Sequence, residues 1–78
     1  MRLSRHSRNN MRLYGISGDD ILKAIKSPDS TGKEGTKTVA IKKLGKRFSG
    51  YPLKIVYEVI EGDECIITAY PLKRKMWR

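Results

Sequence analysis

The first fourteen residues separate small and apolar side chains from cationic ones with helical spacing. Ser4 is suited to the N-cap and Gly15 to the residue after the last turn, so a helix is predicted between them, after a short extended entry at residues 1–3. At about 100° per residue, one side carries these residues: Leu3, Ser7, Asn10, Met11 and Tyr14. The other side carries a stripe of guanidinium groups: Arg5, Arg8 and Arg12. The helix is therefore expected to bury one side and to present the other to phosphates.

A second helix has clear start and stop signals. Ser17 is suited to the N-cap with Asp20 at N3, and Ile16 and Ile21 occupy the two positions of a hydrophobic staple. Pro28 ends the helix. Its apolar residues form a packing face without a reactive group, so this helix is interpreted as structural.

From residue 36 onward the apolar period changes from helical spacing to alternation. Three segments are predicted strands: residues 36–44, 53–60 and 65–70. The segments between these elements are predicted loops or turns: residues 27–37, 44–52 and 61–64. Together these elements predict a single α+β domain over residues 1–78, with two N-terminal helices packed on one face of a three- to four-stranded antiparallel sheet.

The strand pattern also predicts two details of the sheet. The lysine-rich strand at residues 36–44 is expected at the edge, where it would offer free backbone groups to a partner. In the last strand, strict alternation places Thr68 and Tyr70 on the same face as Ile66. If the helices cover that face, both polar side chains lie near the first helix and its His6.

The charge of the chain favours an anionic partner. Lys and Arg number 17 against 8 Asp and Glu, which leaves a formal net charge of +9. Three basic segments, at residues 1–14, 33–54 and 73–78, alternate with two net acidic ones. If the fold brings the basic segments together, they form one positive face, which is typical of a nucleic-acid-binding protein.

Several classes are excluded by what the sequence lacks. No apolar stretch approaches the roughly 20 residues of a membrane span, and no signal-peptide core follows the basic N-terminus. The single cysteine, Cys65, excludes an internal disulfide. With one histidine, acids clustered in turns and no cofactor motif, neither a metal nor a cofactor is expected. The sequence thus predicts a cytoplasmic protein without a membrane partner.

The sequence HSRNNMRLYGIS near the start and IITAYP near the end resemble small bacterial and archaeal families of unknown function. Those families resemble BrnT-type toxins and, more distantly, the RelE/ParE-like toxin fold. The positions that carry the resemblance are His6, Met11, Gly15, Ile16, Ser17, Thr68, Tyr70 and Pro71. Asn10 and Tyr14 depart from the pattern, which usually has a charged residue at both positions. The resemblance implies a toxin-like endoribonuclease of a toxin–antitoxin pair, with an acidic antitoxin and the ribosome as expected partners.

Metal-free RNA cleavage needs a base for the 2′-OH, cations for the phosphate and an acid for the leaving oxygen. His6 is the leading candidate for either proton role, since imidazole is the side chain that titrates near neutrality. Tyr70 and Thr68 are the further catalytic candidates. The candidate phosphate ligands are Arg5, Arg8, Arg12, Lys46, Arg47, Lys73 and Arg74. Two alternatives stay open: a non-catalytic RNA- or DNA-binding module that uses the same basic residues, and a topoisomerase poison of the same fold.

The terminal segment AYPLKRKMWR combines four cations with large apolar residues. Disordered basic tails are poor in such residues. We therefore expect Met76 and Trp77 to pack on the domain and to hold Lys73 and Arg74 beside the arginine stripe of the first helix.

Overall fold

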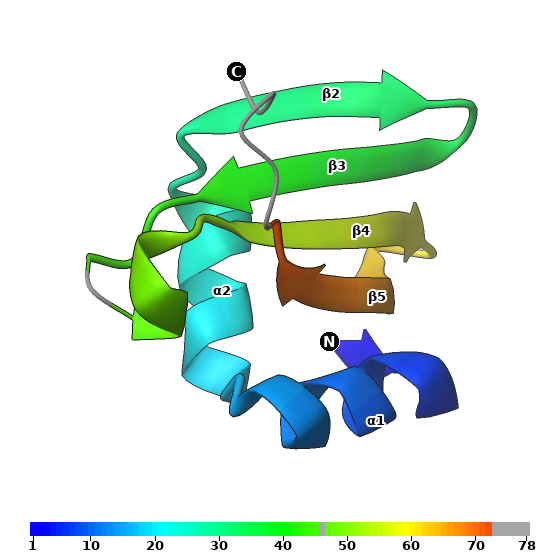
Figure 1. Ribbon diagram of the computed structural model, residues 1–78. Helices are drawn as coiled ribbons and strands as arrows, with labels where there is room; N and C mark the ends of the chain where they lie inside the picture. The colour runs from blue at the N-terminus through cyan, green and yellow to red at the C-terminus, as the bar shows by residue number, and fades with distance from the viewer. Residues whose placement is uncertain (46, 73–78) are drawn as a thin grey trace.

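The computed structural model describes residues 1–45 and 47–72, which form two helices and a mixed five-stranded sheet (Figure 1). In chain order the elements are β1 (Arg2–Leu3), α1 (Arg5–Tyr14), α2 (Gly18–Lys26), β2 (Ser30–Glu34), β3 (Lys37–Lys42), a 3₁₀ turn (Arg47–Gly50), β4 (Leu53–Ile60) and β5 (Asp63–Pro71). The strand order is β1-β5-β4-β3-β2, and all neighbours are antiparallel except β1, which is parallel to β5. The predicted α+β class is confirmed, whereas the predicted sheet of three to four antiparallel strands is too small.

Both helices begin at the predicted caps. The Ser4 hydroxyl accepts a hydrogen bond from the Ser7 amide, and Gly15 ends α1 in the left-handed conformation, with a φ of 69°. At the start of α2, the Ser17 hydroxyl accepts from the Asp20 amide at 3.1 Å, while the Asp20 carboxylate accepts from the Ser17 amide at 2.9 Å. This reciprocal pair satisfies two amides that have no partner within the helix.

The core lies on one face of the sheet. Its buried apolar residues are Ile16, Ile21, Ala24, Ala40, Leu53, Ile55, Ile66 and Ala69. Helix α2 covers β3 and β4 from behind in Figure 1, whereas α1 runs along β5 at the margin of the sheet. Met11 of α1 packs against the core, and Ser7 is fully buried. The predicted packing of both helices on one face is therefore met only in part, because α2 covers the face whereas α1 occupies the border of the sheet.

An extra residue in β5 changes which face its side chains occupy. Tyr57 of β4 pairs with Ile66, but the preceding residue of β4, Val56, pairs with Thr68, so Ile67 is unpaired in a bulge. Ile66 and Ala69 both enter the core as a result. Because Thr68 is directly opposite Val56, it lies on the face away from the core.

Tyr70 follows Thr68 at the next alternate position and is opposite Lys54. Neither side chain therefore lies on the helix-covered face as expected, although Thr68 still contacts Asn10 of α1 at the margin of the sheet. The reason is physical: a bulge inserts one residue and inverts the alternation beyond it.

Two strands were missed by the sequence pattern. β1 has only two residues, too few to show a period. β2 has the sequence STGKE, which lacks an apolar alternation, and it forms because Gly35, with a φ of 66°, turns the chain back onto β3. β3 consequently has a neighbour on each side, and the free edge belongs to β2 rather than to residues 36–44.

Candidate nucleic-acid interface

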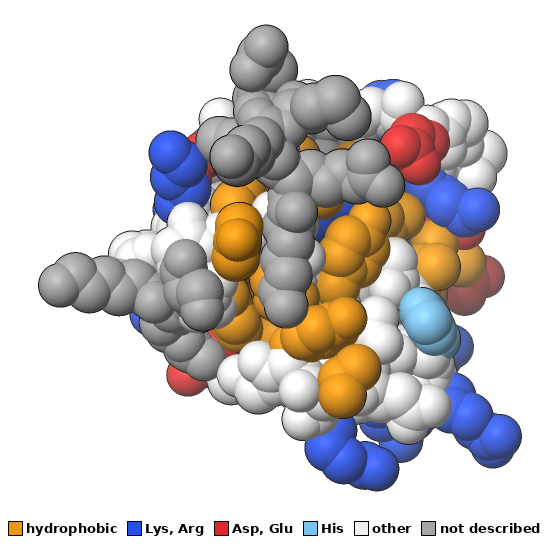
Figure 2. Space-filling view, in the orientation of Figure 1, with side chains coloured by type: hydrophobic (Ala, Val, Ile, Leu, Met, Phe, Trp, Pro, Cys, Tyr) orange, Lys and Arg blue, Asp and Glu red, His pale blue; other side chains and the backbone are white. Residues whose placement is uncertain are grey.

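The face of the sheet opposite the helices is the candidate interface, and we call it the open face. The pairing of β2 to β5 assigns to it the side chains of Ser30, Glu34, Lys37, Val39, Ile41, Lys54, Val56, Glu58, Cys65, Thr68 and Tyr70. Figure 2 views the molecule from this side and shows hydrophobic side chains gathered at its centre, with cations around the periphery. An apolar floor with polar groups at its border suits a planar base and its charged backbone.

Helix α1 is connected to the open face by a hydrogen bond between two side chains. The Asn10 amide nitrogen donates to the Thr68 hydroxyl at 3.2 Å, and both side chains are partly buried. This contact is available because α1 lies at the margin of the sheet, where Asn10 reaches around β5. The side of α1 that carries Asn10 therefore borders the open face.

His6 lies one turn before Asn10 and is exposed. Residues four apart share one side of a helix, so His6 also borders the open face, and Figure 2 shows the imidazole, in pale blue, on this side of the molecule. Within the described residues its ring has no hydrogen-bond partner. The structure thus brings His6 and Thr68 to the same border, through Asn10.

Tyr70 and Lys54 form a pair on the open face. They are directly opposite each other in the antiparallel β4–β5 pairing, and the Lys54 ammonium lies 5.7 Å from the centre of the Tyr70 ring. That distance is within the range of a cation–π contact, which orients the long lysine side chain. Sequence reasoning missed Lys54 as a site residue, because only the register of β4 against β5 places it beside Tyr70.

The predicted arginine stripe is present, and it lies on the side of α1 roughly opposite His6. With Asn9, Arg5, Arg8 and Arg12 line a hollow of about 230 Å³. Arg8 also donates from its Nε atom to the Leu3 carbonyl oxygen at 3.4 Å, which holds it against the start of the helix. Arg8 is about 160° around the helix from His6. The arginine row, as we call Arg5, Arg8 and Arg12, is therefore separated from the open face by the width of α1.

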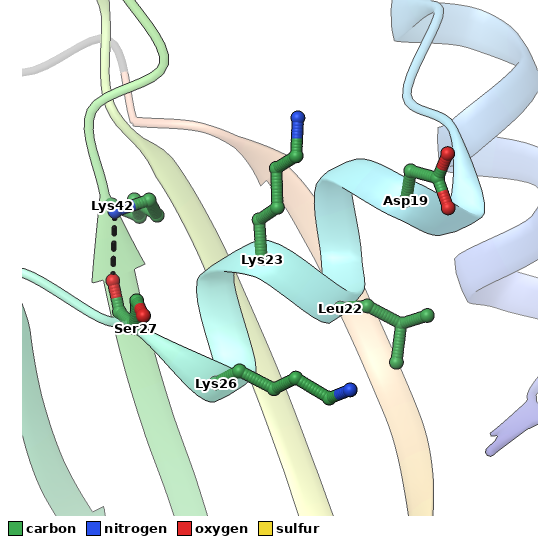
Figure 3. A pocket seen from close by; sticks show the side chains of 6 residues that line it. All are labelled: Asp19, Leu22, Lys23, Lys26, Ser27 and Lys42. Carbon is green, nitrogen blue, oxygen red and sulfur yellow. Dashed lines mark hydrogen bonds between the residues drawn. The ribbon is translucent and has the colours of Figure 1, made fainter.

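A third group of cations lies at the end of α2, behind the sheet. It surrounds a hollow of about 530 Å³ lined by Asp19, Leu22, Lys23, Lys26, Ser27 and Lys42. Figure 3 shows Lys23 and Lys26 pointing away from each other, while the Lys42 ammonium donates to the Ser27 carbonyl oxygen at 2.8 Å. A cation at this position interacts favourably with the last carbonyl groups of the helix and with the negative end of its dipole. Lys54, the arginine row and this group thus lie at three separate places, and the predicted convergence of the basic segments stays a prediction, because Lys46 and residues 73–78 lie outside the described part.

Some predicted site residues lie outside the part of the chain that the structure describes. These are Lys46, Lys73, Arg74 and the side chain of Arg47, together with the proposed anchors Met76 and Trp77. Among residues 1–45 and 47–72, no three His, Cys, Asp or Glu side chains are grouped as metal ligands would be. None of the helices in the same described part is long and apolar enough to cross a membrane.

The fold and its open face define a small, basic α+β domain with one helix at the sheet margin. The chain belongs to the family described as domain of unknown function DUF4258, whose model matches residues 3–71. The matched range includes α1 and β2 to β5, and hence all described residues of the open face. No curated protein and no solved structure matches the chain.

Proposed function

We propose that the open face binds RNA and that the protein cleaves it without a metal, as a toxin-like endoribonuclease. The observation that carries the proposal is the hydrogen bond from Asn10 to Thr68, because it joins the histidine side of α1 to the strand that presents Tyr70. One proton carrier, one phenol and one ammonium then border a single surface. The resemblance of the sequence to BrnT-type and RelE/ParE-like toxins supports the same function.

The chemistry uses the RNA's own 2′-hydroxyl as nucleophile. The His6 imidazole accepts the 2′-OH proton while the 2′ oxygen attacks the adjacent phosphorus. The Lys54 ammonium stabilises the charge that develops on the phosphate oxygens, and the Tyr70 phenol donates its proton to the departing 5′ oxygen. The products are a 2′,3′-cyclic phosphate and a 5′-hydroxyl, and proton exchange with water restores His6 and Tyr70.

In this scheme Thr68 is a positioning residue, since it acts through Asn10. The arginine row binds the flanking phosphates, as guanidinium groups suit phosphate oxygens. An RNA strand that crosses α1 therefore passes from the arginine row to His6. DNA lacks the nucleophile and is bound but not cleaved.

One observation favours a second function, a non-catalytic RNA- or DNA-binding module. Within the described residues nothing fixes the orientation of the His6 ring, whereas a catalytic imidazole is commonly held by a second group. The apolar floor, Lys54 and the arginine row suffice for binding alone. An RNA cleavage assay distinguishes the endoribonuclease from the non-catalytic binding module.

A toxin also needs a partner that restrains it. We propose an acidic antitoxin that pairs with the free edge of β2, since an edge strand offers unpaired backbone groups and the chain carries a net charge of +9. The ribosome is the second proposed partner, as the place where such an enzyme meets its RNA.

The test is cleavage of an end-labelled RNA by purified protein in excess EDTA, with and without ribosomes. Expected products carry 2′,3′-cyclic phosphate and 5′-hydroxyl ends. His6→Ala should lower the rate by about 10²–10⁴, whereas Lys26→Ala, an exposed change on α2, should leave it unchanged. Equal rates for wild type and His6→Ala would assign any cleavage to a contaminant, and binding without cleavage would establish the second function.

A further inference from the structure

A hollow of about 270 Å³ lies on the open face, over the β2–β3 hairpin. Val39 and Ile41 of β3 form its floor, and Lys54 of β4 closes one side. Ser30 and Glu34 of β2 line the other side. The hollow thus has an apolar floor with an ammonium and a carboxylate at its border.

Gly32 keeps this hollow open. It is directly opposite Val39 in the β2–β3 pairing, so any side chain at this position would project over the floor. The backbone does not require glycine, because its φ lies outside the left-handed region and an added Cβ would meet no atom within 4 Å. Glycine weakens a strand interior and often marks a place where a ligand approaches closely.

We propose that this hollow binds one nucleobase of the RNA, with guanine as the preferred base. The proposal rests on the function proposed above and extends it to sequence preference. The flat face of a base suits the floor formed by Val39 and Ile41. Guanine presents two adjacent N–H donors and a carbonyl acceptor on its pairing edge, which complement the Glu34 carboxylate and the Lys54 ammonium.

The position of Lys54 connects this base site to the proposed chemistry. Its ammonium lies against Tyr70 and its side chain also lines the hollow. A base held there therefore lies next to the phosphate on which Tyr70 and His6 act. Single-stranded RNA is recognised in this way, by unstacked bases held on their faces and hydrogen-bonded at their edges.

Two valine variants of the β2–β3 hairpin test the site. Gly32→Val fills the hollow, whereas the control Thr38→Val places a valine at a position of β3 that does not line the hollow and faces the helix side of the sheet, opposite Tyr57. The probes are two fluorescein-labelled 2′-O-methyl strands, which cannot be cleaved: an oligouridine with one central guanosine, and an all-uridine strand. Circular dichroism and thermal melting establish that both variants are folded.

We expect the wild type to bind the guanosine strand more tightly, and Gly32→Val to weaken that binding about tenfold, to the level of the all-uridine strand. Thr38→Val should change the affinity less than twofold, about the effect of an uninvolved surface site. If Gly32→Val does not fold, Glu34→Gln decides, since it keeps the shape of the side chain and should abolish the preference for guanosine. Wild-type binding to neither strand would overturn the proposed function as a whole. Binding that neither Gly32→Val nor Glu34→Gln alters would overturn the base site alone.

Discussion

The hydrogen bond between Asn10 and Thr68 should be measurable as a coupling between α1 and the open face. Thr68→Val keeps the shape of the side chain but removes the acceptor that lies 3.2 Å from the Asn10 amide. A neutral hydrogen bond contributes about 0.5–1.5 kcal/mol net. Both groups are partly buried, so water replaces the lost partner incompletely, and we expect a loss of about 1 kcal/mol. In a chain of this size that corresponds to a Tm decrease of about 4–8 °C.

A double-mutant cycle isolates this contribution. Urea denaturation of the wild type, Asn10→Ala, Thr68→Val and the double variant should give a coupling energy of about 1 kcal/mol. Asn9→Ala is the control for stability, since the side chain of the neighbouring Asn9 is exposed and has no hydrogen-bond partner in the described part. RNA cleavage or affinity should fall in each single variant and hardly further in the double one. Free energies that add within about 0.3–0.5 kcal/mol would show that this bond does not hold α1 against the open face.

Three further predictions concern the caps, the charge and the N-terminus. Ser17→Ala should cost about 1 kcal/mol in urea denaturation, because it leaves the Asp20 amide without its capping oxygen, and an unchanged midpoint would refute the role of the capping box. RNA affinity should fall by about 10³ between 50 and 200 mM salt if six phosphates are bound. Replacing the arginine row with alanines should reduce the slope of log affinity against log salt concentration by about 2. An affinity that does not change with salt would exclude these contacts. The hydrogen bond between the Met1 ammonium and Asp63, at 2.8 Å, raises the pKa of the ammonium above its ordinary 8.0 and lowers the pKa of the Asp63 carboxyl below its ordinary 3.8. The Met1–Asp63 pair therefore contributes its full stabilisation between pH 3.8 and pH 8.0. That stabilisation is lost as the pH rises through the raised pKa of the ammonium or falls through the lowered pKa of the carboxyl. Thermal melting from below the lowered pKa to above the raised pKa should show both losses in the wild type and neither in Asp63→Asn.

Local signals in the sequence were sufficient for the helices. Ser4, Ser17 and Gly15 mark their ends through contacts with residues three or four positions away, which a local pattern can show. The strands β4 and β5 were predictable for a similar reason, since their apolar runs are joined by a tight turn in which Glu61 and Gly62 both have a positive φ.

The composition of the site depended on pairings that no local signal encodes. The bulge at Ile67 put Thr68 and Tyr70 on the face of the sheet opposite the core, and an apolar segment such as CIITAY gives no sign of an extra residue. Lys54 and Gly32 gained their significance only from the residues directly opposite them. The contact between α1 and Thr68 arises because Asn10 reaches around the margin of the sheet.

The central claim is that RNA binds the open face beside α1. Chemical-shift mapping with a non-cleavable 2′-O-methyl RNA measures this directly on isotope-labelled protein. We expect perturbed resonances at His6, Lys54 and Tyr70 and at the β2–β3 hairpin, with the resonances of Leu22 and Lys26 on α2 unchanged. Perturbations confined to the hollow around Leu22 and Lys26, or none at saturating RNA, would contradict the account.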